Sequence, residues 1–282
     1  MTRKEGKKTL EYDAADQMVV SAARMVKDTD SIYVGVGLPM LAAVLASHTH
    51  APNCVIVIEN GIVRASKFPL PRTTDSLGSQ ALADQLCGLV HINCLGQAGY
   101  ITTGFMGAGQ IDRYGNVNDT VVGDYNNPVY RWPGSGGGND VMSICGGTII
   151  ILRQSKRRFL PKVDFITCPG YLDGRPGQRE QAGLLPNTGP VAVVTDLAVY
   201  SFEDGEMTVK SVHAGVGVTL DMVKAELSWD VKVAKDLTDT EPPTEEELRV
   251  LHDEVDPTKM WVGGRRSPSA QEPVPVHVKE PE

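Results

Sequence analysis

The sequence has 282 residues, of which 41% are hydrophobic and 22% are charged, and its formal net charge is −8. This apolar content excludes a disordered chain, and no apolar run reaches the roughly 18 residues of a membrane helix. The basic start, residues 1–13, is not followed by an apolar segment, so a secretory signal peptide is not expected. An acidic chain without a basic stripe is a poor candidate for nucleic-acid binding. We therefore expect a cytoplasmic globular protein with neither nucleic acid nor membrane as its partner.

The cysteines and histidines show no pattern of a disulfide scaffold or a metal site. Five cysteines are present, an odd number, and no Cys-x-x-Cys pair occurs. This usage is typical of reduced, buried thiols in a cytosolic protein. The six histidines are scattered without metal-ligand spacing, so no metal is expected.

The first half of the chain alternates between helical and strand patterns. Apolar residues recur every three or four positions over residues 13–26, which predicts an amphipathic helix with Asp13 as its N-cap. A buried strand is predicted at 31–36 and a second helix at 39–48. Residues 54–59 (CVIVIE) form a continuous apolar run that ends in a carboxylate. Continuous apolar strands between helices indicate a parallel sheet covered on both faces.

Strand patterns cluster in the second half. Further strands are predicted at 101–112, 147–154, 162–168 and within 191–213, where a hairpin turns at 203–205, and further helices at 75–98, 219–229 and 244–255. Together these elements predict an α/β fold with an open, mostly parallel sheet that is flanked by helices and partly mixed. We expect a single domain over residues 1–262 and a disordered, Pro-rich tail over 263–282.

Glu59 is the strongest single candidate for chemistry. It ends a buried strand and precedes the turn residues Asn60 and Gly61. Open α/β sheets bind ligands at the carboxyl ends of their strands. A partly desolvated carboxylate there has a raised pKa and can act as a base or a nucleophile. The alternative is that Glu59 caps or salt-bridges a neighbouring loop.

Glycine clusters mark further candidate sites. The run 134–138 (GSGGG) can present backbone N–H groups to an oxyanion or a phosphate, or it can be a flexible surface loop. It matches neither a P-loop nor a dinucleotide-binding fingerprint. A third position of close backbone approach is Gly35-Val36-Gly37. The basic run 156–158 is typical of a solvated face, and an anionic ligand or a partner subunit is the other interpretation.

Five segments occur in order along the chain: GVGLPMLAA, IVIENG, GAGQIDRYGNVN, GSGGGND and RRFLPKVDFITCPG. Together they resemble the β-type subunit of class I CoA-transferases, and GAGQIDRYGNVN points to the glutaconate CoA-transferase-like branch. The resemblance runs from about residue 10 to residue 260. It implies an α/β fold with an open sheet, and an active site between this subunit and an α-type subunit of a hetero-oligomer. It also implies that coenzyme A, the co-substrate, is bound largely by the α-type chain.

The resemblance also assigns roles to residues. Glu59 matches the catalytic glutamate, which carries CoA from an acyl-CoA to a carboxylic or dicarboxylic acid through a covalent glutamyl-CoA intermediate. Asn60 and Gly61 form the turn beside this nucleophile. Oxyanion or acyl binding falls to five positions: Val36, Gly37, Gly136, Gly137 and Gly138.

Two alternatives belong to other classes of function. A subunit of an acyl-CoA hydrolase or a ring-opening CoA-thioester hydrolase would use water in place of the acceptor acid. Hydrolases and decarboxylases of this fold lack a glutamate at the position of Glu59, which favours the transferase. A non-enzymatic partner chain with a vestigial pocket would bind CoA esters without converting them.

Overall fold

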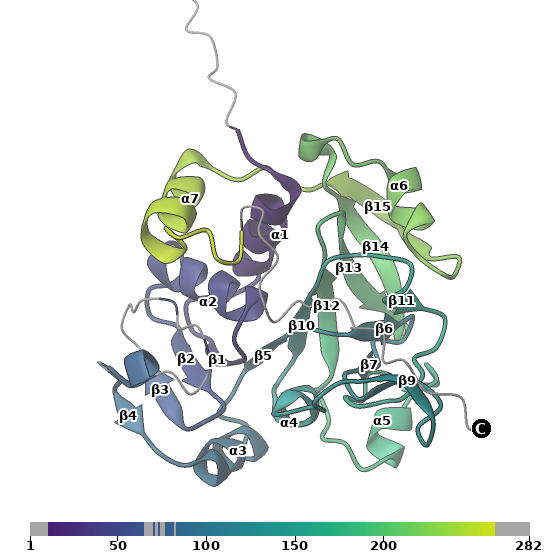
Figure 1. Cartoon of the computed structure of the whole chain (residues 1–282), viewed down its shortest axis with the longest axis horizontal. Helices are drawn as coiled ribbons and strands as arrows, with labels where there is room; N and C mark the ends of the chain where they lie inside the picture. Colours follow the sequence, from purple (N-terminus) through teal and green to yellow (C-terminus); the bar gives the residue numbers. More distant parts are fainter. Residues whose placement is uncertain (1–10, 65–69, 71–72, 74–76, 82, 263–282) are drawn as a thin grey trace, which may run out of the picture.

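A ten-stranded sheet organises the computed structural model, which describes residues 11–64, 70, 73, 77–81 and 83–262 (Figure 1). The helices are α1 (Ala14–Ala23), α2 (Leu38–His48), α3 (Leu89–Gln97), α4 (Gly138–Ile144), α5 (Gln178–Gln181), α6 (Leu220–Ala225) and α7 (Glu245–Arg249), with the 3-10 helices η1 (Leu77–Gln80) and η2 (Ala214–Val216) and the π-helix η3 (Val250–Val255). The strands are β1 (Ser31–Val34), β2 (Val55–Ile58), β3 (Ile62–Arg64), β4 (Gln85–Leu86), β5 (Thr103–Met106), β6 (Gln110–Asp112), β7 (Val117–Asn118), β8 (Val121–Gly123), β9 (Pro128–Arg131), β10 (Thr148–Ile151), β11 (Phe159–Leu160), β12 (Pro190–Val194), β13 (Ala198–Glu203), β14 (Glu206–Val212) and β15 (Lys232–Asp239).

The middle of this sheet is parallel and its flanks are mixed. The strand order is β15-β14-β13-β12-β10-β5-β1-β2-β3-β4. The strands from β12 to β2 run parallel, whereas β3, β4 and β13 add antiparallel pairs at the two sides. This confirms the predicted α/β fold with a mostly parallel, partly mixed sheet. The carboxyl ends of the five parallel strands therefore meet at one edge, where open α/β sheets bind ligands.

Each face of the sheet carries its own apolar core. Alternate side chains of β1 point to opposite faces: Ile32 and Val34 belong to the core that includes α1, α2 and η3, whereas Tyr33 belongs to the core that includes α3, α4 and α6. The small sheet β11-β6-β7 also lies on the second face, through buried Ile111 and Phe159. Figure 1 shows α1, α2 and α7 grouped at upper left, and α3 and α4 at the lower edge. α3 and α4 pack together, with Gly96 against Ile144.

Several local predictions are confirmed. Asp13 caps α1, accepting hydrogen bonds from the backbone N–H groups of Ala15 and Asp16. The predicted hairpin joins β13 to β14, and its turn residues Asp204 and Gly205 have φ angles of 51° and 75°. The left-handed conformation of both residues suits a tight hairpin turn. The predicted tail, 263–282, lies outside the described residues, so the domain boundary at 262 stays a prediction.

The predicted strand at 162–168 is wrong. The N–H groups of Thr167 and Cys168 both donate to the carbonyl oxygen of Val117, which makes only an isolated bridge with β7. The Val163 N–H donates to the Asp112 carboxylate instead of to a strand. The segment is a loop in which Val163 and Cys168 are buried and Phe165 and Ile166 are exposed.

The predicted helix at 75–98 is also wrong as one element, because η1, β4 and α3 divide its described part. β4 pairs with β3, and the Cys87 N–H donates to the Gly61 carbonyl oxygen at 2.8 Å. Pairing with a neighbouring strand thus overrides the helical pattern before Gly88, after which α3 begins. Residues 75, 76 and 82 lie outside the described residues.

His213 makes the stability of this fold depend on pH. It is fully buried, and its ring nitrogens bond Thr240 Oγ1 at 2.9 Å and the Thr195 carbonyl oxygen at 2.8 Å. Burial lowers the pKa of His213 to about 4, whereas an unfolded histidine titrates near pH 6.5. Below about pH 6.5 His213 therefore binds a proton in the unfolded chain but not in the folded chain. His213 should cost up to about 3 kcal/mol of unfolding free energy as the pH falls from 6.5 to 4.

Urea unfolding at pH 7.5 and pH 5 measures this effect. The variant His213→Gln should lose less stability between these two pH values than the wild type does. The comparison needs the variant, because burial raises the pKa of Asp119 to about 6 and gives that group the opposite pH dependence in both proteins. An equal loss in the two proteins would show that His213 does not carry the effect.

None of the helices within the described ranges is long and apolar enough to cross a bilayer.

Candidate active site

Glu59 lies at the start of the tight turn that joins β2 to β3. The strand ends at Ile58, one residue earlier than predicted, and Ile58 pairs with Ile62 across the turn. The Gly61 N–H closes the turn by donating to the Ile58 carbonyl oxygen at 3.0 Å. Gly61 has a φ of 104°, and a Cβ there would overlap the Cys87 carbonyl group, so the turn requires glycine. The turn fixes Glu59 at the carboxyl edge of the parallel strands.

The two carboxylate oxygens of Glu59 have different surroundings. Oε2 accepts a hydrogen bond from the Gly137 N–H, with 3.0 Å between the two heavy atoms. Oε1 accepts no hydrogen bond from any described residue, and the side chain is only partly buried. Asn60, the middle residue of the turn, is exposed. One oxygen is thus held by the protein and the other is open to an incoming group.

Three consecutive glycines, residues 136–138, lie at the start of α4 and have different structural roles. A Cβ on Gly137 would overlap Oε2 of Glu59, so only glycine lets the backbone come this close. Gly136 has a φ of 49° and bends the chain just before this contact. The Gly138 N–H donates to the Ser135 carbonyl oxygen at 2.8 Å and closes the bend. Among the three, Gly137 is the one whose N–H reaches the carboxylate.

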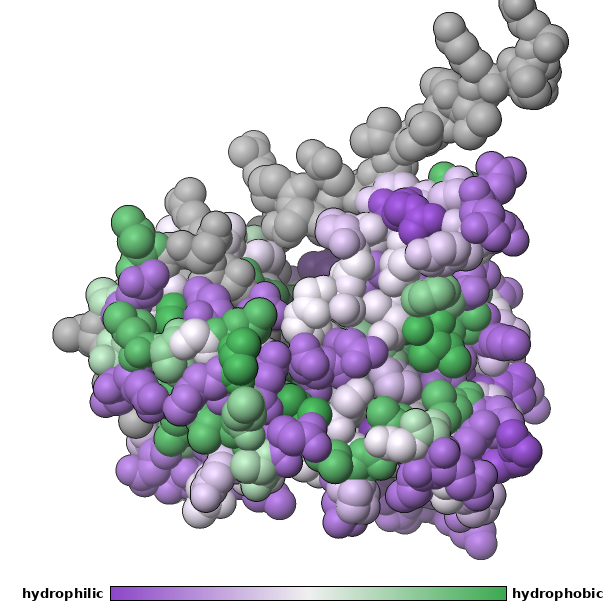
Figure 2. All heavy atoms as spheres, turned by 90° about the horizontal axis from the view of Figure 1, so that it is seen from below, coloured by the Kyte–Doolittle hydropathy of each residue, from purple (hydrophilic) through white to green (hydrophobic). Residues whose placement is uncertain are grey.

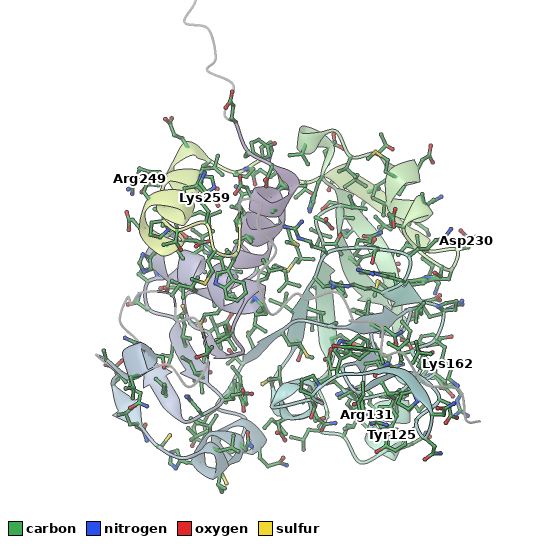
Figure 3. All side chains as sticks on the ribbon, viewed as in Figure 1. Tyr125, Arg131, Lys162, Asp230, Arg249 and Lys259 are labelled. Carbon is green, nitrogen blue, oxygen red and sulfur yellow. The ribbon has the colours of Figure 1, made fainter. Side chains whose placement is uncertain are left out.

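The β8–β9 hairpin leads directly into this glycine loop. Figure 3 shows Tyr125 and Arg131 close together at lower right, where the Arg131 guanidinium lies 4.8 Å from the centre of the Tyr125 ring. Arg131 Nη2 also donates to the Tyr125 carbonyl oxygen at 2.6 Å. The next residue, Trp132, packs on Gly109, where a Cβ would lie 3.0 Å from the Trp132 ring. These contacts anchor the start of the glycine loop.

The GAGQIDRYGNVN motif is a structural turn. The Asp112 carboxylate is buried and accepts hydrogen bonds from the backbone and the side chain of Asn116. Asn116 Oδ1 accepts in turn from the N–H groups of Gly170 and Leu172. Burial raises the pKa of Asp112, and its hydrogen bonds oppose that shift. The motif thereby ties residues 112–116 to 170–172.

This structural turn also supports α4. Asn139 Nδ2, in the first turn of α4, donates to the Thr167 carbonyl oxygen at 2.8 Å. Gly138 packs on Cys168, where a Cβ would lie 3.2 Å from Sγ. Thr167 and Cys168 are both bonded to Val117 of β7. The position of the Gly137 N–H therefore depends on segments that are distant in sequence.

The Val36-Gly37 turn follows β1, which pairs in parallel with β2, so this turn and the Glu59 turn leave the sheet at the same edge. Gly37 has a φ of 106° and caps α2. A Cβ on Gly37 would lie 3.8 Å from Pro39 and from the Trp261 ring. The close neighbours of Gly37 therefore belong to α2 and the end of the described chain, and Glu59 is not among them.

Tyr33 and Asn93 also lie at this site, and the sequence predictions omit both. The Tyr33 hydroxyl donates to Asn93 Oδ1 at 3.2 Å, and it lies 3.2 Å from the point where Gly137 would carry a Cβ. Burial, with the negative charges of Glu59 and Asp140 nearby, raises the pKa of Tyr33, so the hydroxyl stays neutral. The one signal in the sequence was a tyrosine within an apolar strand.

No three His, Cys, Asp or Glu side chains come together as possible metal ligands in the described ranges.

Comparisons with known proteins identify the family of this chain. The family model described as Coenzyme A transferase matches residues 16–225. The chain is 40% identical to the B-type subunit of 3-oxoadipate CoA-transferase of Pseudomonas knackmussii, over 85% of this chain and 92% of that one. It is 34% identical to the B-type subunit of glutaconate CoA-transferase of Acidaminococcus fermentans, over 89% and 95% of the two chains. The crystal structure of glutaconate coenzyme A-transferase from Acidaminococcus fermentans superposes with a TM-score of 0.84 at 30% identity, covering 90% of this chain and 99% of that one. The chain therefore belongs to the coenzyme A transferase family.

Proposed function

We propose that this chain is the β-type subunit of a CoA-transferase and that Glu59 is its nucleophile. The observation that carries this proposal is the difference between the two Glu59 oxygens, since Gly137 holds Oε2 and leaves Oε1 open. A carboxylate held through one oxygen presents the other in a fixed direction for attack on a carbonyl carbon. Membership of the family supports the same assignment.

The reaction proceeds through covalent intermediates on Glu59. Oε1 attacks the thioester carbonyl carbon of an acyl-CoA, the C–S bond breaks, and CoA thiolate leaves behind a mixed anhydride. The thiolate then attacks the glutamyl carbonyl carbon, the acyl group leaves as a carboxylate, and a glutamyl-CoA thioester forms. An acceptor carboxylate reverses these steps, departs as the new acyl-CoA and regenerates Glu59.

The Gly137 N–H has a defined role in these reaction steps. Once Oε1 is acylated, Oε2 is the glutamyl carbonyl oxygen, and attack by the thiolate places negative charge on it. The donor already lies 3.0 Å from that atom, so it stabilises the oxyanion without rearrangement. One such donor contributes on the order of 3 kcal/mol to the transition state. In this proposal Gly136 and Gly138 shape the bend that aims the donor, and Val36 and Gly37 border the acyl pocket.

An α-type subunit is the partner in this proposal. Large apolar side chains close to the Glu59 turn are exposed, with Leu86, Leu89 and Val90 at 59%, 52% and 76%. Figure 2 shows apolar side chains among polar ones on the left of the lower face, the side on which Figure 1 draws β4 and α3, and a further apolar group on the right. Exposed apolar patches mark protein interfaces. We infer that the α-type subunit covers this surface and supplies most of the coenzyme A site.

We further propose that the complex works in the cytoplasm on an acyl-CoA and a carboxylic or dicarboxylic acid, with coenzyme A as co-substrate and no metal. The thiols of all five cysteines are free in the structure, and three of them are buried. Free thiols are typical of a reducing compartment.

The test uses this chain co-expressed with a candidate α-type CoA-transferase subunit from the same organism. A panel of acyl-CoA esters is supplied with and without acceptor carboxylates, and new CoA esters are measured. We expect conversion that depends on the acceptor and yields its CoA ester. Release of free CoA without any acceptor would identify a hydrolase instead. Binding of CoA esters without conversion across the panel would identify a non-enzymatic chain.

A further inference from the structure

Tyr33 is a buried residue that lies between Glu59 and α3. It lies on β1 in register with Val57, two residues before Glu59, and its side chain is fully buried. A Cβ built on Gly137 would have three nearest neighbours: Glu59 Oε2, the Tyr33 hydroxyl and Glu59 Cβ. The phenol, the carboxylate and the donor N–H therefore converge from β1, β2 and the start of α4.

The hydroxyl of Tyr33 is directed at α3. The structure gives it one acceptor, Asn93 Oδ1 at 3.2 Å. In this bond the phenol donates its proton, so the oxygen of the carboxamide faces Tyr33. The Nδ2 group of Asn93 bonds no described residue, and the side chain is partly exposed. The bond thus fixes the carboxamide at the rim of the site with its donor side unused.

α3 has few other anchors. Only Ile92 and Gly96 are buried among its residues, and its N-cap, Gly88, supplies no side-chain hydrogen bond. Leu95 is partly buried against the same core, and Gly96 packs on Ile144 of α4, so a small set of contacts sets the position of α3. Asn93 stands beside these two buried residues, so its bond to Tyr33 ties α3 to the centre of the parallel sheet.

We propose that Tyr33 is a positioning residue, whose hydroxyl holds the Asn93 carboxamide, and with it α3, in place beside the Glu59 nucleophile. This proposal rests on the proposed function of Glu59. Because the Tyr33 side chain is fully buried and its hydroxyl donates to Asn93, its influence on the reaction is assigned to Asn93. Its loss should therefore lower kcat and leave the KM for acyl-CoA unchanged.

The chain offers a closely matched control. Tyr200 is also fully buried on the same face of the sheet, and its hydroxyl donates to Gln154 Oε1, another carboxamide oxygen, at 2.6 Å. Gln154 is bonded to Thr195 and Val223, and Tyr200 lies on β13, away from the Glu59 turn. Tyr33→Phe and Tyr200→Phe therefore each remove a phenol hydroxyl that donates to a carboxamide oxygen, one near Glu59 and one away from it.

The experiment measures steady-state kinetics and hydrogen exchange on the complex with the α-type subunit. Tyr33→Phe should lower kcat about tenfold with the KM within twofold, because one hydrogen bond is worth about a factor of ten. Tyr200→Phe should leave kcat within about twofold of the wild type. Asn93→Ala should lower kcat, and Tyr33→Phe in that background should lower it no further, since both changes break one interaction. Amide exchange of α3 should accelerate in Tyr33→Phe and not in Tyr200→Phe.

The outcomes distinguish a failure of the Tyr33 proposal from a failure of the proposed function. If the wild-type complex transfers CoA and Tyr33→Phe is equally active, the role of Tyr33 is wrong while the proposed function stands. The same holds if the effects of Tyr33→Phe and Asn93→Ala multiply in the double variant. A wild-type complex that transfers no CoA overturns the proposed function. In that case exchange still decides the positioning, because unchanged protection of α3 in Tyr33→Phe contradicts it.

Discussion

Replacing Glu59 by Gln should abolish CoA transfer, with a loss in kcat on the order of 10⁴-fold or more. The amide keeps the shape of the side chain and an oxygen that can accept the Gly137 hydrogen bond, so the site should stay folded. It lacks the anionic oxygen that attacks the thioester, and no covalent intermediate can form. Steady-state transfer by the purified complex measures the loss.

Glu59→Asp should also lose activity, although less. One methylene fewer moves the attacking oxygen by about 1.5 Å, and misplacement near 1 Å costs roughly 10²-fold. Glu203→Gln is the matched control, because Glu203 is an exposed glutamate at the end of β13. It should be as active as the wild type. A Glu59→Gln enzyme within about tenfold of wild-type activity would show that a different group is the nucleophile.

Gly137→Ala should lower kcat by roughly 10²- to 10³-fold, the range for a lost oxyanion donor. The added Cβ would overlap Glu59 Oε2, so either the carboxylate or the α4 backbone must move and the 3.0 Å hydrogen bond is lost. Gly137 has a φ of −76°, which alanine adopts freely. The loss should therefore come from the site and not from strain in the backbone.

Kinetics and thermal unfolding together check this expectation. Glu203→Gln is again the control, since Glu203 is exposed at the end of β13, away from the Glu59 turn. Both variants should unfold within a few degrees of the wild type, and only Gly137→Ala should lose activity. If Gly137→Ala keeps a kcat within threefold of the wild type, the donor role of its N–H is wrong.

The sequence indicated Glu59 and the glycine loop as separate candidates, but only the folded structure shows that they meet. Glu59 and Gly137 are 78 residues apart, and the hydrogen bond between them depends on the packing of α4 against Thr167 and Cys168. No local pattern in the sequence predicts that Glu59 and Gly137 come within hydrogen-bonding distance. Only the resemblance to a family placed Glu59 and the glycine loop in the same site, because their spacing in the sequence does not.

Tyr33 and Asn93 show why part of the site escaped prediction. Tyr33 stands in an apolar strand where its ring fits the core pattern, so the pattern gives its hydroxyl no separate signal. Asn93 sits in a short helix of mixed character. Their meeting is a tertiary event, as is the strand pairing that breaks the expected helix at Gln85 and Leu86.

The central claim is that CoA becomes covalently attached to Glu59, and trapping tests it most directly. The complex is incubated with acyl-CoA and no acceptor, treated with borohydride to reduce any thioester, digested and analysed by mass spectrometry. We expect the peptide that contains Glu59 to carry a reduced side chain, in amounts that depend on acyl-CoA and are absent from Glu59→Gln. An unmodified Glu59 peptide from a complex that is turning over would contradict the claim.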